Sequence, residues 1–535
     1  MKLSIEGIKD KKEWEKAGIK LPSYDVGKVA TATKEAPAWV HFGIGNIFRI
    51  FIGGIADSLL EQGLSDKGIT CVETFDYDVV DKIYTPFDNL VMAVTLKEDG
   101  STDKKVLGSL TEAVKAQSSV EADWSRLKTI FASPQLQMVS FTITEKGYAL
   151  HDAKGEFFPF IKSDIDNGPD KASSAMAVVA ALLLERFNTC KAPLAVVSMD
   201  NCSHNGEKLR NSVTEMVSEW AKKGFVGEDF VQYVNDENTI SFPWSMIDKI
   251  TPRPADSVAK ALEDAGVEAM APVITSKRTY IAPFVNAEGP QYLVIEDRFP
   301  NGRPQLEKAG VYMTDRDTVN KVERMKVTTC LNPLHTALAV YGCVLGYDLI
   351  ADEMKDKELS ELVRRIGLVE GMPVVTDPGI ISPEKFADEV LHVRIPNPFM
   401  PDTPQRIATD TSQKVGIRYG ETIKAYVEKE GSAESLTAIP LAIAGWCRYL
   451  LGVDDNGESF ELSADPMAEE LKAQLDGVRF AEPSSYTGQL KNLLSNANIF
   501  GINLYEAGIG DKIEELFVEE IAGKGAVRAT LKKYL

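Results

Sequence analysis

The sequence predicts an α/β N-terminal half built on a parallel sheet and a mostly α-helical C-terminal half. Up to about residue 200, short apolar runs typical of buried strands alternate with amphipathic helical segments. After about residue 300, almost every segment has helical periodicity instead. The 535 residues exceed what a single hydrophobic core normally holds, so we expect two domains.

The first βαβ unit begins near residue 38. The run "AWVHF" predicts a strand over Trp39–Phe42, and "GIGNIFRIFIGGIADSLLEQG" predicts a glycine turn followed by a helix that ends near Gly63. The run "GITCVETF" predicts a second strand directly afterwards, an order typical of a parallel sheet. Further strands are predicted in "NLVMAVTL", "MVSFTIT" and "PLAVVSM", and a helix from about Ser174 to Phe187 precedes the last of them.

The C-terminal half is predicted to be helical. Segments such as "HTALAVYGCVLGYDLI", "DKELSELVRRIGLVEG" and "DKIEELFVEEIAG" carry apolar residues at helical spacing. Pro and Gly cluster in "RFPNGRPQLEKAG", which favours a domain boundary there. We therefore predict a polar surface extension over residues 1–37, an α/β domain over residues 38–305 and a helical domain over residues 306–535.

Composition limits the possible partners. The chain has 59 Lys and Arg against 79 Asp and Glu, a net charge of -20, so we expect no nucleic-acid partner. The six cysteines form no CxxC pair, which favours reduced thiols and a cytoplasmic protein. The N-terminal stretch lacks the apolar core of a signal peptide, and the most apolar run, Ala175–Leu184, is too short for a bilayer span. We expect a soluble monomer or homodimer without a membrane partner.

The glycine turn after the first strand is the first candidate site. Gly43, Gly45 and the following Asn46 lie between a strand and a helix, where peptide N–H groups and the helix dipole can hold a pyrophosphate. The G-x-G-x-x-G pattern is incomplete, because Phe48 takes the third position. We therefore expect this helix to pack less closely on its strand than usual.

Polar residues follow two other predicted strands. Glu73 ends the second strand, where a carboxylate can accept hydrogen bonds from ribose hydroxyls and would repel a 2′-phosphate, which favours NAD. Asp76 and Asp78 are alternative acceptors. The loop "SMDNCSHNG" places Asp200 and Asn201 at the carboxyl end of another strand, where loops of a parallel sheet face the ligand. Together these positions predict dinucleotide binding.

Neither a zinc site nor a Tyr-x3-Lys pair is expected to carry the chemistry. Cys202 and His204 lack the further ligands that zinc needs, since the chain has five histidines and no second Cys/His cluster. The one Tyr-x3-Lys pair, Tyr24 and Lys28, precedes the first strand. A carbonyl reduction would need another acid/base group, and lysine can serve when burial lowers its pKa toward neutrality.

Eight segments occur in the order seen in the polyol-specific long-chain dehydrogenase/reductase family, also called the mannitol dehydrogenase family. They are "HFGIGNIFR", "NLVMAVTLKEDG", "VSFTITEKGY", "SMDNCSHNG", "FPWSMIDKITP", "LNPLHTALA", "RIATDTSQK" and "AIAGWCRYLLGVDDNGESFELSADP". The similarity extends from about residue 38 to 470. The resemblance implies a Rossmann-type N-terminal domain that binds NAD, a helical C-terminal domain, an active site in the cleft between them, and metal-independent hydride transfer.

The resemblance also implies residue roles. Lys326 resembles the general acid/base, and Asn201 and Asn332 resemble the amide pair that holds the reacting oxygen. His335 resembles a residue that contacts substrate hydroxyls. Further substrate-binding positions implied by the motifs are Asp248, Arg406 and Lys414. For Asp248 and Arg406, an ion pair that only stabilises the domain interface is the structural alternative.

The chain departs from the family pattern at three positions. Trp244 stands where the family has Asn, and Pro333 follows the motif asparagine where the family has a small residue. Five residues separate Lys326 from Asn332, whereas the family has four. Trp244 could change the shape of the pocket wall, and the longer spacing between Lys326 and Asn332 affects how Lys326 reaches the site.

Lys326 and His335 would point to opposite sides of one continuous α-helix, because each residue turns by about 100°. Either a π-bulge absorbs the extra residue, or the helix begins only at Pro333 with Asn332 near its N-cap. We expect the second arrangement, because proline suits a first helical turn and "VTTC" is a poor helix-forming run. Lys326 would then lie in a non-helical segment.

Basic residues favour an acidic substrate. A sugar acid needs a cation for its carboxylate, and Lys277 and Arg278 of "TSKRTY" join Arg406 and Lys414 as candidates. We therefore expect interconversion of D-fructuronate and D-mannonate. Mannitol 2-dehydrogenase and tagaturonate reductase activities are alternatives, and a non-catalytic sugar or nucleotide sensor is an alternative of another class.

Overall fold

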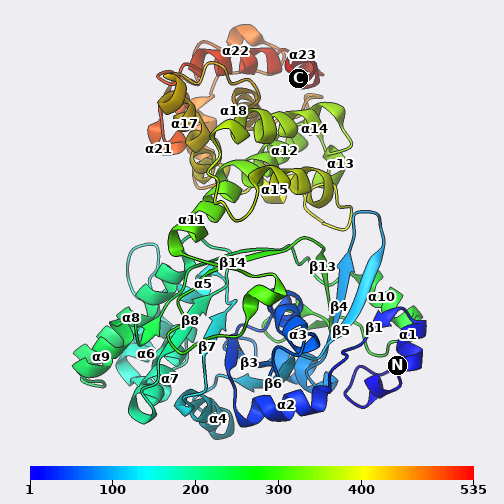
Figure 1. Cartoon of the computed structure of the whole chain (residues 1–535). Helices are drawn as coiled ribbons and strands as arrows, with labels where there is room; N and C mark the ends of the chain where they lie inside the picture. Colours follow the sequence, from blue (N-terminus) through cyan, green and yellow to red (C-terminus); the bar gives the residue numbers. More distant parts are fainter. The chain divides into compact units, whose positions relative to one another are not determined.

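The computed structural model describes all 535 residues and divides into two compact units, drawn in Figure 1. Unit 1 comprises Met1–Lys97 and Ser101–Asn320, and unit 2 comprises Glu98–Gly100 and Lys321–Leu535. The main division therefore lies after the predicted boundary at residue 305. The reason is that β15 (Tyr312–Thr314) still pairs with β14 (Tyr292–Glu296) of unit 1. Each unit is described by itself.

The central sheet of unit 1 has six parallel strands in the order β6-β3-β2-β7-β8-β9. Their bounds are β2 (Trp39–Phe42), β3 (Ile69–Glu73), β6 (Leu110–Lys115), β7 (Met138–Phe141), β8 (Leu194–Ser198) and β9 (Ile240–Ser241). The chain order reverses between β2 and β7, and a dinucleotide binds at such a switch point in sheets of this order. The predicted Rossmann-type architecture is confirmed.

Helices cover both faces of this sheet, and every residue of the central strands β2, β3, β7 and β8 is buried. Val40 and Phe42 of β2 join one core, to which α4, α7 and α8 also contribute. Trp39 of the same strand joins the opposite core with residues of α3. The helices of unit 1 that lie outside the N-terminal segment are α3 (Gly53–Glu61), α4 (Glu121–Ala132), α5 (Glu145–Tyr148), α6 (Pro159–Asn167), α7 (Ala175–Thr189), α8 (Asn205–Lys222), α9 (Glu228–Asn235), α10 (Asp256–Asp264) and the first half of α11 (Arg316–Met325).

Residues 1–37 belong to unit 1 and are not merely a surface extension. Trp14 of α1 (Lys11–Lys16) is 1% exposed, and β1 (Ile19–Lys20) pairs in parallel with β5 (Thr102–Leu107). In α2 (Val26–Glu35), Val26 and Val29 are buried. The prediction was wrong because isolated apolar residues in a polar segment are enough to anchor short elements.

Three smaller sheets complete unit 1. One has the order β1-β5-β4-β13, another has the order β10-β14-β15, and β11 pairs with β12 as a hairpin. The bounds of the additional strands are β4 (Val91–Leu96), β10 (Ser245–Asp248), β11 (Val273–Ile274), β12 (Tyr280–Ile281) and β13 (Phe284–Glu288).

Unit 2 is helical, as predicted, and is built around two apolar helices. All twelve residues of α18 are buried, and α18 packs against both α12 and α22. Its α-helices are α12 (Asn332–Leu345), α13 (Ile350–Glu353), α14 (Lys357–Arg364), α15 (Pro383–Glu389), α16 (Pro404–Ile407), α17 (Glu421–Glu430), α18 (Ala438–Tyr449), α19 (Ala468–Gln474), α20 (Lys491–Leu494), α21 (Ala497–Phe500), α22 (Gly510–Glu520) and α23 (Ala526–Tyr534). None of the helices combines the length and the apolar character that a membrane span requires.

Short π-helical segments recur at the ends of helices in both units. They are η2 (Phe48–Ile52), η3 (Val80–Tyr84), η7 (Lys326–Cys330), η8 (Arg365–Gly371), η10 (Val390–Arg394) and η12 (Gly416–Gly420). Such wide turns are uncommon and are frequently found at functional sites. In unit 2, η7 packs against both η8 and η12.

Candidate active site

The turn between β2 and the first helix contains two glycines with different requirements. Gly43 has φ of +86°, and a Cβ there would lie 2.2 Å from the carbonyl oxygen of Thr142, so only glycine fits. Gly45 has ordinary backbone angles, and a Cβ there would meet no atom within 4 Å. The protein itself does not require glycine at position 45, but the resulting space allows a ligand to approach the backbone, as pyrophosphate binding needs.

Asn46 begins the helix after this turn. Its side-chain Oδ1 is buried and has no hydrogen-bonding partner in the protein. Buried polar atoms nearly always have a partner, so an unsatisfied one beside an open glycine turn is compatible with a bound ligand or water. The predicted cofactor-binding turn therefore has the backbone space and the polar atom that a dinucleotide would need.

Phe48, which replaces the third glycine of the pattern, is fully buried and stacks on His41, with ring centroids 4.0 Å apart. It opens the π-helical segment η2. The close helix–sheet contact is made one turn later at Gly53, where a Cβ would lie 3.3 Å from Cδ2 of Leu110. The missing glycine is thus replaced by a wide turn and a later glycine.

Glu73 at the end of β3 is buried and binds backbone N–H groups. Its Oε1 accepts from the N–H groups of Thr74, Phe75 and Asp76 at 2.9–3.2 Å, and its Oε2 lies 3.4 Å from the N–H of Ile44. Burial raises the pKa of Glu73, and these N–H groups oppose the shift. The carboxylate therefore fixes the turn after β3 against the glycine turn, and its contact with ribose stays a prediction.

The two alternative acceptors hold the β11–β12 hairpin. Asp76 accepts from the Thr275 hydroxyl at 2.6 Å, and Asp78 accepts from the N–H of Ser276 at 2.8 Å. The Ser276 N–H and Lys82 lower the pKa of Asp78 to about 2. Both carboxylates thus hold this hairpin, and the buried Oδ1 of Asp76 has no hydrogen-bonding partner in the protein.

The basic residues of "TSKRTY" lie in this same hairpin of unit 1. Lys277 lies over the ring of Phe75, 5.2 Å from its centroid, and Phe75 is 67% exposed. Lys277 and its neighbour Arg278 are therefore next to the turn at the end of β3. Their predicted contribution to a substrate carboxylate has no support from this placement.

Asp200 and Asn201 follow β8. Asp200 accepts from the N–H groups of Ile143 and Thr144 at 2.9 Å and from the Tyr148 hydroxyl. Burial raises the pKa of Asp200, and these donors oppose the shift. Asp200 therefore organises the loop after β7, and its role as a cofactor ligand stays a prediction. Asn201 is exposed on the loop.

Trp244, one of the three departures from the family pattern, packs against other aromatic and basic side chains. Its ring packs against the ring of His204, with centroids 4.7 Å apart, and Arg316 lies over it at 5.2 Å. A Cβ on Gly206 would lie 2.5 Å from Cδ1 of Trp244. Trp244 and His204 thus form a packed aromatic wall near the β8–α8 loop. Asp248, a predicted substrate-binding residue, is buried at the end of β10.

In unit 2, Lys326 is the first residue of η7, and the prediction of a non-helical segment is wrong. The N–H of Leu331 bonds the carbonyl of Lys326 at 3.1 Å, which is the i to i+5 bond of a π turn. A new helix, α12, does begin at Asn332 with Pro333 in its first turn. The chain therefore has both predicted alternatives, the π-helical turn and a new helix. The π turn takes up the extra residue between Lys326 and Asn332, and Pro333 favours the start of a new helix. The Lys326 residue is only 4% exposed.

His335 lies on the first turn of α12, partly buried. Its Nε2 is 3.5 Å from Oδ2 of Asp402. Burial lowers the pKa of His335 to about 4; Asp402 opposes this shift, and Arg418, Arg406 and Arg394 reinforce it. His335 is therefore neutral at physiological pH, as suits a donor or acceptor for a sugar hydroxyl.

Arg406 and Lys414 both have partners within unit 2. Arg406 forms an ion pair with Asp402, four residues earlier, and its side chain is 63% exposed. Lys414 donates to the carbonyl of Thr409, and burial together with Arg418 lowers its pKa. Unit 2 carries the predicted residues Lys326, Asn332, His335, Arg406 and Lys414 on η7, α12 and the segment 402–414. Of these, His335 and Arg406 lie on the same carboxylate, that of Asp402.

Two arginines near His335 were missed by sequence reasoning. Arg394 is buried in η10, and Arg418 is partly buried in η12. A signal for Arg418 was present, because it follows Lys414 by four residues and therefore lies on the same side of a helix. No comparable signal existed for Arg394, since its neighbours "VLHVRI" only indicate a buried segment.

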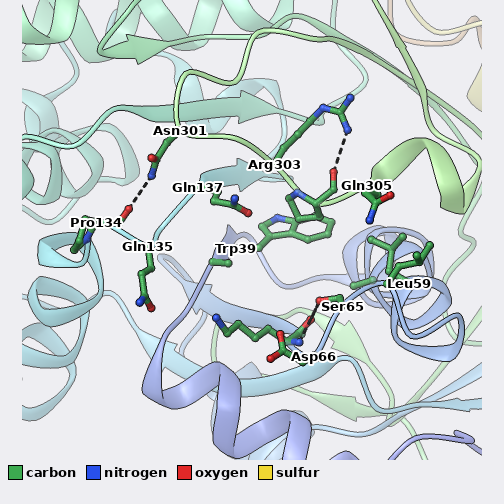
Figure 2. A pocket seen from close by; sticks show the side chains of 16 residues that line it. Trp39, Leu59, Ser65, Asp66, Pro134, Gln135, Gln137, Asn301, Arg303 and Gln305 are labelled. Atoms are coloured by element: carbon green, nitrogen blue, oxygen red, sulfur yellow. Dashed lines mark hydrogen bonds between the residues drawn. The ribbon is translucent and has the colours of Figure 1, made fainter.

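A pocket of about 510 Å³ opens elsewhere in unit 1. Figure 2 shows the side chains that line it. Trp39 at the start of β2, Gln137 just before β7, and Gln305 line it, and Arg303 donates to the carbonyl of Pro304 at its edge. These residues mark the amino ends of the strands. Ligands of parallel sheets bind at the carboxyl ends, so this pocket has no part in the candidate site.

Comparisons with known proteins agree with this division of the chain. Residues 37–308 match the mannitol dehydrogenase Rossmann domain, and residues 318–518 match the mannitol dehydrogenase C-terminal domain. The D-mannonate oxidoreductase of Thermotoga maritima is 54% identical over 536 residues, which cover 100% of this chain and 99% of that protein. A polyol:NADP oxidoreductase of Gluconobacter oxydans is 29% identical over 86% of this chain and 88% of its own.

Solved structures give the same result. The Pseudomonas fluorescens mannitol 2-dehydrogenase, in a ternary complex with NAD and D-mannitol, is 26% identical with a TM-score of 0.69, covering 100% of this chain and 99% of its own. A substrate-free D-sorbitol dehydrogenase is 25% identical with a TM-score of 0.78, covering 96% of this chain and 98% of its own. Both comparisons extend over the sheet-based and the helical unit.

Proposed function

The chain belongs to the mannitol dehydrogenase family, and we propose that its reaction is the interconversion of D-fructuronate and D-mannonate. It is an NAD-dependent oxidoreductase that acts on a CH–OH group. The observation that carries the choice of a sugar acid is the 54% identity to a D-mannonate oxidoreductase along the full length of both chains. The arginines around His335 support it, because a carboxylate entering an acidic protein needs a local cation.

We assign cofactor binding to the glycine turn and its surroundings. Gly43 and Gly45 would let the backbone approach the pyrophosphate, and Asn46 would use its unsatisfied Oδ1. Glu73 would accept from the ribose, while Asp200 would shape the loop beside it. NAD(H), when bound, supplies or accepts the hydride.

Lys326 is the proposed general acid/base. During reduction, its ammonium would give a proton to the carbonyl oxygen that becomes an alkoxide, and during oxidation its amine would take the hydroxyl proton. Asn201 and Asn332 would donate amide N–H groups to the same oxygen and stabilise its developing charge. The almost complete burial of Lys326 supports this role, because a closed active site shields its acid/base group from bulk water.

Substrate hydroxyls and carboxylate would be held by His335, Asp248, Arg406 and Lys414. The neutral His335 can both donate to and accept from a hydroxyl. Arg406 and Lys414 supply positive charge on the segment that follows Asp402. Mannitol 2-dehydrogenase activity is the second candidate, because relatives with that name match most of this chain and one of them has a similar fold.

Oxidation of NADH by the purified protein tests the proposal. The panel is D-fructuronate, D-tagaturonate and D-fructose, each compared by kcat/KM at the same pH. We expect D-fructuronate to have the highest value. Faster turnover of D-fructose would favour the neutral substrate instead, and faster turnover of D-tagaturonate would favour the epimeric acid.

We further propose that the protein is cytoplasmic and is a monomer or a homodimer. All six cysteines are free thiols, and four of them are buried, as suits a reducing compartment. Light scattering coupled to size-exclusion chromatography would measure the mass. A tetramer or larger assembly would contradict the proposal.

A further inference from the structure

Arg418 is a partly buried guanidinium without an anionic partner. Its one hydrogen bond runs from Nη1 to the hydroxyl of Thr336, although the group has five N–H donors. Burial lowers the pKa of Arg418 to about 10, and Tyr419 alone opposes the shift, so no carboxylate of the protein compensates the charge. A desolvated charge is unfavourable unless it is paired and hydrogen-bonded.

Three other buried arginines donate at least two hydrogen bonds each to backbone carbonyls of the protein. Arg49 donates to the carbonyls of Ala282 and Pro283 at 2.7 and 2.8 Å. Arg186 donates five hydrogen bonds, all to backbone carbonyls, and Arg448 donates three. Arg418 therefore differs from these structural arginines in keeping most of its donors unused.

The position of Arg418 is set by bonds to the two elements that carry the proposed catalytic residues. The next residue, Tyr419, donates to the carbonyl of Pro333 at 2.9 Å, and Thr422 donates to the carbonyl of Thr328 at 3.3 Å. These bonds tie η12 and α17 to α12 and η7. Because Thr336 adjoins His335, the guanidinium lies next to the proposed substrate-binding turn.

Positive charge exceeds negative charge around His335. Arg394, Arg406 and Arg418 all act on this imidazole, and Asp402 is the carboxylate with the largest effect on it. Asp402 is already paired with Arg406. An anion placed beside His335 would therefore find Arg418 with donors unused, whereas Arg406 would first have to share or leave its own partner.

We propose that Arg418 is the counter-ion of the substrate carboxylate and thereby selects sugar acids over neutral ketoses. The inference rests on the proposed function, and it assigns to Arg418 the charge recognition that the motif alone would assign to Arg406. An Arg–carboxylate contact can use two parallel N–H bonds, which fixes the orientation of the acid as well as its charge. Arg406 then contributes to the site through Asp402.

The test compares four proteins, the wild type, Arg418→Met, Arg418→Lys and Arg324→Met, with D-fructuronate and D-fructose. Arg324 is the charge-matched control, because its guanidinium is 56% exposed and already bound to Glu421 at 2.6 Å. We expect Arg418→Met to raise the KM for D-fructuronate at least 10-fold, to change kcat/KM for D-fructose less than 3-fold, and to leave kcat on the acid within 3-fold. Arg418→Lys should recover part of the loss, and Arg324→Met should match the wild type.

Thermal unfolding without substrate separates binding from folding. Since the guanidinium has no anionic partner before substrate binds, the Tm of Arg418→Met should equal or exceed that of the wild type. A lower Tm together with equal losses on the acid and the ketose would make Arg418 a structural residue and overturn the inference, as would an unchanged KM for the acid. If the wild type itself does not reduce D-fructuronate, the proposed function fails first, and the inference falls with it.

Discussion

Replacing Glu353 by Gln should stabilise the protein at neutral pH and have little effect at pH 5. Glu353 ends α13 and is fully buried, and neither of its carboxylate oxygens has a hydrogen-bonding partner. It fits only because Gly342 of α12 has no side chain, since a Cβ there would lie 2.1 Å from Oε1. Burial, and to a smaller extent Asp356, raises the pKa of Glu353 from 4.5 to about 10.

The sign and size of the effect follow from this shift. Because the folded-state pKa lies above the unfolded value, the contribution of Glu353 to stability is present below pH 4.5 and is lost as pH rises toward 10. At pH 7 the loss is about 3 kcal/mol, from roughly 1.4 kcal/mol for each pH unit above 4.5, and at pH 5 it is below about 1 kcal/mol. The amide of Gln has the shape of the protonated acid and cannot ionise, so it avoids this loss.

Scanning calorimetry at pH 5 and pH 7 measures the effect. At pH 7, Glu353→Gln should raise the Tm of the transition of unit 2 by roughly 6–12 °C, given about 2–4 °C per kcal/mol for a unit of this size. Glu361→Gln provides a control of opposite sign, because Arg364 and Arg365 lower the pKa of Glu361 to about 2 and its removal should destabilise at pH 7. If the Tm difference between Glu353→Gln and the wild type were the same at both pH values, Glu353 would not be protonated in the fold and the reasoning would be refuted.

Four further predictions concern the site. Lys326→Ala should abolish hydride transfer but leave NADH binding, measured by fluorescence titration, unchanged. Replacement of the exposed Lys321 by Ala is the control, and a large loss of activity in Lys321→Ala would contradict the assignment. Activity should survive exhaustive treatment with a strong chelator, and a loss that added zinc restores would exclude the lysine mechanism. NADH should give a higher kcat/KM than NADPH, and the reverse order would mean that Glu73 does not face the ribose. His335→Gln should lose less Tm than the wild type between pH 6.5 and 4.5, because a histidine whose folded pKa is lowered to about 4 destabilises the fold as pH falls below 6.5; equal losses would mean that His335 titrates normally.

The α/β unit was largely predictable because its signals are local. The strands over Trp39–Phe42 and Ile69–Glu73 are apolar and bounded by turns, and the glycine turn between them needs positive φ at Gly43. Residues 1–37 were misjudged because their few apolar anchors, such as Trp14, are too scattered to produce a periodic pattern.

The sequence allows candidate site residues to be named, but not their partners. Lys326, Asn332 and His335 were proposed from one short motif, and the phase of the chain between them depends on a π turn that no propensity indicates. The use of Asp200 to hold the loop after β7 depends on contacts with Ile143 and Tyr148, which are distant in sequence. Arg418 was missed for the same reason. That its guanidinium has no anionic partner can be recognised only when the surrounding side chains have been placed in the structure.

The π turn at Lys326–Cys330 also bears on how chain length can vary in this region. The extra residue between Lys326 and Asn332 is taken up inside one turn, by the bond from Leu331 to Lys326, and the break at Leu331 lets α12 start afresh. An insertion carried into an ordinary α-helix would rotate every later side chain by about 100° and expose its core face. Here the insertion is confined to a single bulge, so α12 can keep the packing of its buried residues whether four or five residues precede Asn332. Length variation next to Lys326 is therefore tolerated without a change in the helical core that follows.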